Sequence, residues 1–115
     1  MTNRALIIQD IQTPSFDDSE FMVARNLVAE YCSTELVALS SIKKVRYRCV
    51  VVSMDMLKED PMAIIGSLRD AEKEFGLHPA QLLVAGLVAG RSRQPTPAEM
   101  AKFNISAHIR FHHLS

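Results

Sequence analysis

The strict alternation of apolar and polar residues in the segment FNISAHIRF, residues 103–111, constrains the fold of this chain more than any other feature. Successive side chains of a β-strand point to opposite faces, so this pattern places all the apolar side chains of the segment on one face. A helix would scatter them around its circumference. The segment therefore predicts a half-buried strand whose inward residues are Phe103, Ile105, Ala107, Ile109 and Phe111.

A second interpretation of this region is a DNA-binding motif. The sequence TPAEMAKFNISAHIRFHHLS resembles the helix-turn-helix of many bacterial regulators, and the resemblance implies a C-terminal recognition helix. The spacing between Ala101 and Ile105 is one residue shorter than in those families, and no glycine stands at the turn. The residues that carry the resemblance are Glu99, Met100, Ala101, Ile105, Ser106, His113 and Leu114.

A third interpretation is a metal site formed by the C-terminal histidines. On a helix, His108 and His112 would share a face and could chelate an ion. On a strand they would lie about 13 Å apart, too far to reach one zinc ion with ligand distances of about 2 Å. The strand interpretation therefore predicts no metal, and no pattern in the sequence indicates a cofactor.

The rest of the chain alternates between short apolar strands and amphipathic helices. The stretch ELVALSSI, residues 35–42, fits either a helix or a strand. Capping residues mark the helix starts at Asp60-Pro61 and at Thr96-Pro97-Ala98-Glu99, and Gly76 marks a helix end. The predicted strands are residues 4–11 and 44–54, and the predicted helices are residues 17–32, 60–76, 79–89 and 96–102.

If residues 35–42 are extended, this order is β-α-β-β-α-β with extra helices before the last strand. That is the order of a ferredoxin-like α+β sandwich, a mostly antiparallel sheet with helices on one face. A length of 115 residues suits one domain, so we expect residues 1–115 to form a single unit.

The composition disfavours some classes of function. Thirteen basic and thirteen acidic residues give a formal net charge of zero, whereas nucleic-acid binders usually carry a basic excess. Cys32 and Cys49 form no C-x-x-C motif, and apolar surroundings should raise the pKa of both thiols and make them inert. The longest apolar run, residues 82–90, is about half a membrane span. We expect a cytoplasmic protein.

The function that these features favour is that of a small regulatory or adaptor protein that acts through protein contacts, as a homodimer. The predicted helix at residues 79–89 is apolar on all sides, which suggests cover by a second subunit. No catalytic constellation is apparent, so an enzyme is not favoured. The expected interface residues are Val50, Val52, Leu83 and Leu87.

The alternative is a nucleic-acid-binding protein that uses a basic face of the sheet or the C-terminal helix-turn-helix. The densest basic cluster lies just before and within the predicted strand at residues 44–54, and a basic, proline-rich linker follows residue 90. The candidate contact residues are Lys43, Lys44, Arg46, Arg48, Arg91, Arg93, His108, Arg110 and His112. A third hypothesis, a small enzyme, depends on Asp10 alone, at the end of the first strand.

Overall fold

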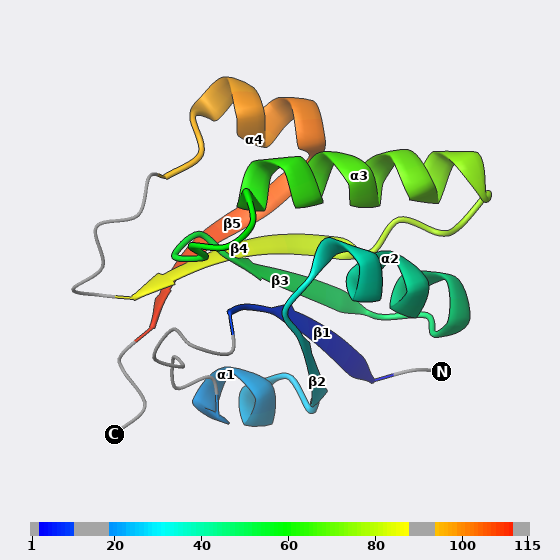
Figure 1. The fold of residues 1–115 in the computed structure, drawn as a ribbon. Helices are drawn as coiled ribbons and strands as arrows, with labels where there is room; N and C mark the ends of the chain where they lie inside the picture. Colours follow the sequence, from blue (N-terminus) through cyan, green and yellow to red (C-terminus); the bar gives the residue numbers. More distant parts are fainter. Residues whose placement is uncertain (1–2, 11–18, 88–93, 112–115) are drawn as a thin grey trace.

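The computed structural model describes residues 3–10, 19–87 and 94–111. Within these residues, one five-stranded sheet has the order β2-β1-β3-β4-β5, and every neighbouring pair of strands is parallel (Figure 1). The strands are β1 (Arg4–Ile8), β2 (Val28–Cys32), β3 (Cys49–Ser53), β4 (Gln81–Leu87) and β5 (Ile105–Phe111). The helices are α1 (Ser19–Ala24), α2 (Glu35–Lys44), α3 (Pro61–Glu74) and α4 (Pro97–Phe103).

The direction in which the sheet grows explains where the helices lie. The chain moves outward from β1 to β2, and then returns across β1 to β3 and continues to β4 and β5. Crossovers between parallel strands are right-handed, so reversing the direction of growth moves the helix to the opposite face. Accordingly, of the helices in the described residues, α1 covers one face of the sheet, and α2, α3 and α4 cover the other (Figure 1).

The prediction of a ferredoxin-like, mostly antiparallel sandwich is wrong. The observed strand order is that of doubly wound, flavodoxin-like α/β proteins, with helices on both faces. Strands at the centre of such a sheet are buried on both sides and lose the alternation of a half-exposed strand. All five residues of β3 are buried, and its sequence CVVVS is accordingly apolar on both faces.

The first half of the sequence contains one more strand and one more helix than the prediction had resolved. The helix predicted at residues 17–32 is in fact α1 followed by β2, and Asn26 turns the chain between them with a φ of 52°. The ambiguous residues 35–42 are helical and belong to α2. Thr34 begins that helix, because its side-chain oxygen accepts a hydrogen bond from the Val37 N–H at 3.2 Å.

Within the helix predicted at residues 79–89, Gln81–Leu87 form strand β4, in the interior of the sheet, and residues 88 and 89 fall outside the described residues. Its all-round apolar character follows from burial between two layers of helices and needs no second subunit. The expected interface residues Val50, Val52 and Leu83 are 2%, 0% and 4% exposed and belong to the core. Leu87 is the last residue of β4.

The capping signals were confirmed. Asp60 accepts a hydrogen bond from the Met62 N–H at 3.0 Å and begins α3, and Gly76 follows the helix with a φ of 62°. Thr96 and Glu99 form a reciprocal capping box at the start of α4. The strand predicted near the C-terminus is β5, so the helix-turn-helix is wrong: α4 leads into a strand rather than a recognition helix.

A bulge in β5 changes which residues share a face. Leu82 of β4 lies opposite Ile105, but the next residue, Leu83, lies opposite Ala107. The extra residue on β5 is Ser106, so Ile105 joins the core under α3 whereas Ala107 and Ile109 pack on the face of α1. The prediction that these apolar residues share one face of a strand was therefore correct for Ala107 and Ile109 but wrong for Ile105, and wrong for Phe103, which is the last residue of α4.

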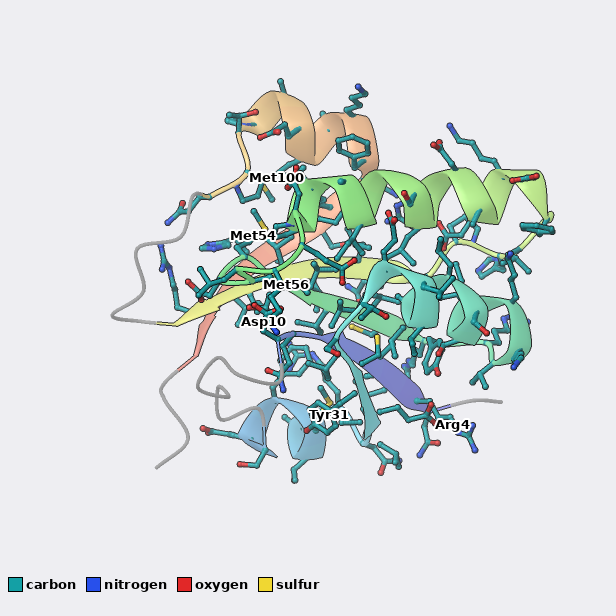
Figure 2. The ribbon with its side chains drawn as sticks, viewed as in Figure 1. Arg4, Asp10, Tyr31, Met54, Met56 and Met100 are labelled. Carbon is teal, nitrogen blue, oxygen red and sulfur yellow. The ribbon has the colours of Figure 1, made fainter. Side chains whose placement is uncertain are left out.

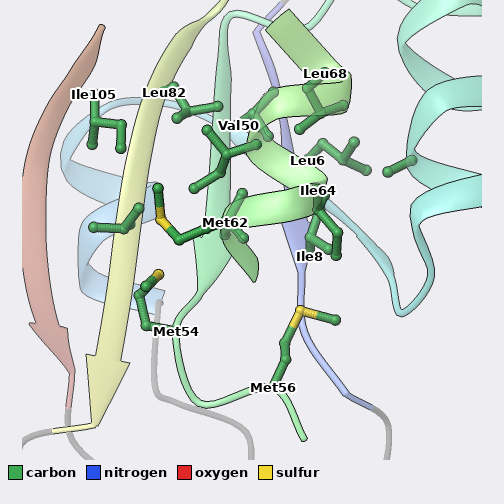
Figure 3. Packing of buried hydrophobic residues seen from close by; sticks show 14 of the residues in the cluster. Leu6, Ile8, Val50, Met54, Met56, Met62, Ile64, Leu68, Leu82 and Ile105 are labelled. Atoms are coloured by element: carbon green, nitrogen blue, oxygen red, sulfur yellow. The ribbon is translucent and has the colours of Figure 1, made fainter. Parts of the chain in front are cut away.

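Two apolar layers hold the sheet to its helices. The larger lies under α2, α3 and α4, where Leu6, Ile8, Val50 and Leu82 meet side chains of α3 such as Ile64 (Figure 3). The smaller lies under α1 and contains Ile7, Val51 and Phe21, among others. In the part of the chain that the structure describes, no helix combines the length and apolar character that a membrane span requires.

Arg69 of α3 ties three elements together at one end of the sheet. Its guanidinium donates to the carbonyl oxygens of Phe103 and Asn104, which end α4, at 2.8 and 2.9 Å. It also donates to the Ala80 carbonyl, before β4, and pairs with Glu72 at 2.8 Å, where both side chains are only 11% exposed. The Ala80 N–H donates in turn to Glu72.

Replacing Arg69 by Ala should therefore lower the free energy of unfolding by about 3 kcal/mol, because Glu72 keeps a buried charge without its partner. Chemical denaturation measures this, with Asp70→Ala at the exposed neighbouring position as the control. A loss for Arg69→Ala no greater than that for Asp70→Ala would show that this ion pair does not stabilise the fold.

Candidate functional site

The carboxyl edge of the sheet contains the first candidate site. In doubly wound sheets, ligands bind outside the carboxyl ends of the strands where the strand order reverses. Here the reversal lies between β1 and β3. Asp10 follows β1 at this edge, and the loop from Met54 to Asp60 follows β3. Figure 2 shows Asp10, Met54 and Met56 together at this end of the molecule, with Arg4 at the other.

Asp10 holds the loop after β3. Its side chain is 6% exposed, and Oδ2 accepts hydrogen bonds from the backbone N–H groups of Leu57, at 2.5 Å, and Lys58, at 3.4 Å. A buried carboxylate needs such donors, because burial without them is costly. Sequence reasoning singled out Asp10 as a candidate catalytic group, and the structure shows it binding the backbone of a loop that lies 47 residues further along the chain.

Two further contacts shape the same loop. The Ser53 hydroxyl oxygen accepts a hydrogen bond from the Asp55 N–H at 3.2 Å. The Glu59 carboxylate accepts from the N–H of Glu35, at 3.0 and 3.2 Å, in the first turn of α2. A carboxylate there satisfies a free helix N–H and suits the positive end of the helix dipole. The loop is thus joined to both β1 and α2.

Large apolar side chains are exposed around this junction. Leu57 in the loop is 87% exposed, and Leu36 in the first turn of α2 is 79% exposed. Tyr31, near the end of β2, is 56% exposed. Sequence reasoning missed these residues, because no local pattern distinguishes an exposed apolar residue from a buried one in segments that contain both, as β2 and α2 do.

His108 lies on β5 in register with Val84 of β4. Its Nε2 atom is buried and has no hydrogen-bond partner among the described residues. Desolvation lowers the pKa of His108 below its ordinary 6.5, and the charge of Arg110 lowers it further, whereas Asp55 acts in the opposite direction. The structure therefore favours a neutral imidazole at this position.

The described residues among those predicted to bind nucleic acid lie in two parts of the fold. Lys43 and Lys44 end α2, and Arg46 and Arg48 lie in the segment before β3, so all four are exposed at the amino edge of the sheet. His108 and Arg110 lie on β5. Arg91, Arg93 and His112 fall outside the described residues.

The two cysteines are free thiols, and Cys49 is buried. Burial raises the pKa of both Cys32 and Cys49 to about 11, as the apolar sequence around them predicts. Among residues 3–10, 19–87 and 94–111, no group of three His, Cys, Asp or Glu side chains is placed to hold a metal ion.

The fold is similar to that of solved receiver domains. The receiver domain of NtrC4 from Aquifex aeolicus matches 91% of this chain and 79% of that chain, with a TM-score of 0.65 and 16% identity. The chemotaxis protein CheY4 from Vibrio cholerae matches 94% of this chain and 85% of that chain, with a TM-score of 0.63 and 11% identity.

The receiver domain of Ssk1 from Saccharomyces cerevisiae, solved with the histidine phosphotransfer protein Ypd1, matches 95% of this chain and 78% of that chain, with a TM-score of 0.64 and 13% identity. No protein-family model matches the sequence, and no curated protein matches it at a significant level. At these identities the likeness shows the fold alone, which is the receiver-type α/β fold.

Replacing Asp10 by Ala should free the loop after β3, because the Leu57 and Lys58 N–H groups lose their acceptor. We expect a loss of about 1–3 kcal/mol in the free energy of unfolding and faster hydrogen exchange at these two amides. Asp10→Asn keeps an acceptor oxygen and should lose less. Unchanged exchange at both amides in Asp10→Ala would contradict the role of Asp10 as the anchor of this loop.

The lowered pKa of His108 predicts a pH dependence of stability. Below pH 6.5 the unfolded chain takes up a proton that the folded chain resists, so stability is lost as the pH falls from 6.5 towards the lower folded pKa. Thermal unfolding between about pH 7 and pH 5 should show a shallower loss in His108→Asn than in the unmodified protein. The matched control is the replacement of His78, an exposed histidine, by Asn.

Proposed function

We propose that this chain is a small signalling or regulatory module that acts by binding another protein at the carboxyl edge of its sheet. The observation that carries the proposal is the pair of exposed leucines, Leu36 and Leu57, beside the junction between Glu59 and the first turn of α2. Single exposed apolar residues are ordinary on protein surfaces. Two large ones beside one anchored junction are suited to serve as apolar contacts for a partner.

The contacts under this surface support the proposal. Asp10 fixes the backbone at Leu57, and Glu59 joins the same loop to α2. A loop held in this way loses little conformational freedom when a partner binds, so more of the contact energy appears as affinity. An exposed leucine on an unanchored loop would lack this advantage.

The solved neighbours support a protein partner by analogy of fold. The Ssk1 receiver domain was solved in a complex with the phosphotransfer protein Ypd1. A shared fold does not by itself confer a shared function, so the partner of this chain is assigned by its chemistry. It should present an apolar patch that covers Leu36 and Leu57.

Self-association stays a prediction. The residues that suggested it lie in the core or at the end of β4, so a homodimer would have to use other surfaces. Binding to nucleic acid also stays a prediction, and the separation of its candidate residues between β5 and the amino edge of the sheet does not favour it.

A photo-crosslinking amino acid placed at position 57 tests the proposal in cells, with the same amino acid at position 23 as the matched control. Val23 is 80% exposed but lies on α1, on the other face of the sheet. We expect a crosslinked partner from position 57 and none from position 23.

The purified partner should then bind the unmodified chain, and Leu36→Glu with Leu57→Glu should weaken that binding at least about tenfold, by about 1.4 kcal/mol. Both side chains are exposed, so the thermal unfolding temperature should change little. Equal crosslinking from positions 57 and 23, or full affinity in the double variant, would contradict a docking surface at this edge.

A further inference from the structure

A cavity of about 430 Å³ opens at the amino edge of the sheet, opposite the proposed docking surface. One wall comes from the end of α2 and the segment that leads into β3, and the other from the end of α3 and the segment that leads into β4. Its volume lies in the range typical of small-molecule sites. The basic side chains of its lining are Lys43, Lys44, Arg46 and His78.

The charge of this cavity is positive, because its acidic group is already neutralised. Glu72 is the one acidic residue among the described residues that line it. Its side chain is buried, and its two oxygens accept from Arg69 at 2.8 Å and from the Ala80 N–H at 2.8 Å. No acidic side chain of the described lining therefore remains to oppose an anion.

The remaining wall is apolar and aromatic. Ile42, Val45 and Leu77 contribute aliphatic surface, and Tyr47 contributes its ring. The Tyr47 hydroxyl donates to Glu30 at 2.7 Å, so this group is directed to a partner outside the lining. A ligand that fits such walls carries a planar or apolar part as well as negative charge.

The helix dipoles limit how an anion can be held here. Both α2 and α3 end at this edge, and the carbonyl ends of helices carry partial negative charge. Lys43 is placed to offset that charge, and its ammonium also lies 4.3 Å from the centre of the Phe75 ring. Lys44 and Arg46 then remain to contact the phosphate. Of these two residues, Arg46 lies beyond the end of α2.

We propose that this cavity binds a small phosphorylated molecule of about mononucleotide size, with Lys44 and Arg46 at the phosphate and the apolar wall against the rest of the ligand. A guanidinium and an ammonium are the side-chain groups best suited to phosphate oxygens. The hollow between two helix ends suits a small ligand better than a nucleic-acid strand. Arg48, the next basic residue, lines a different hollow, beside Arg25.

Isothermal titration calorimetry with adenosine monophosphate at low salt tests this proposal. We expect a dissociation constant below about 1 mM, weaker binding of inorganic pyrophosphate, and at least about a tenfold loss in the double variant Lys44→Gln, Arg46→Gln. Arg48→Gln is the matched control, an exposed arginine two residues away, and should bind as the unmodified chain does.

Amide NMR shifts provide a second measurement, independent of the variants. Adenosine monophosphate should move the Gly76 and Leu77 resonances at the cavity and leave those of Leu57 and Lys58, at the opposite edge, unchanged. Full affinity in the double variant would show that the ligand does not bind at this cavity. An equal loss in Arg48→Gln would show that binding depends on diffuse positive charge and would also overturn the proposal. A single-stranded oligonucleotide that binds more tightly than adenosine monophosphate, and whose binding is lost when Lys44, Arg46 and Arg48 are each replaced by Gln, would overturn the proposal and indicate a nucleic-acid ligand.

Discussion

The burial of β1, β3 and β4 on both faces is the constraint on which the rest of this structure depends. Parallel strands can be joined only by crossovers, and each crossover places a helix on one face of the sheet. The two apolar layers under α1 and under α2, α3 and α4 are therefore consequences of strand direction. Ile7 and Val51 in the layer under α1, and Val84 in the layer under α2, α3 and α4, are all fully buried.

The same topology places the two candidate sites at opposite edges of the sheet. At the carboxyl edge, Asp10 and Glu59 hold a loop that exposes Leu57, and Leu36 is exposed in the turn of α2 that Glu59 binds, which is the basis for proposing a protein partner there. At the amino edge, the ends of α2 and α3 gather basic side chains around a cavity. The chain has no net charge, so this separation of residue types was not visible in its composition.

Sequence reasoning succeeded where the determining interactions are local. The capping box of Thr96 with Glu99, the cap of Asp60 and the stop at Gly76 each act within a few residues, and all three were confirmed. It failed at β2 and β4, whose residues also satisfy a helical pattern. Asp10 was identified as a candidate, but its partners at Leu57 and Lys58 are too distant in sequence for any local pattern to indicate.

The sequence by itself determined that residues 105–111 form a strand and where α3 and α4 begin, because alternation and capping depend on nearest neighbours along the chain. Only the tertiary structure decided that the sheet is parallel. A largely apolar segment such as QLLVAGL is compatible with a buried helix or a buried strand, and pairing with β3 and β5 resolves the choice. Both candidate sites likewise exist only because distant segments end at the same edge of the sheet.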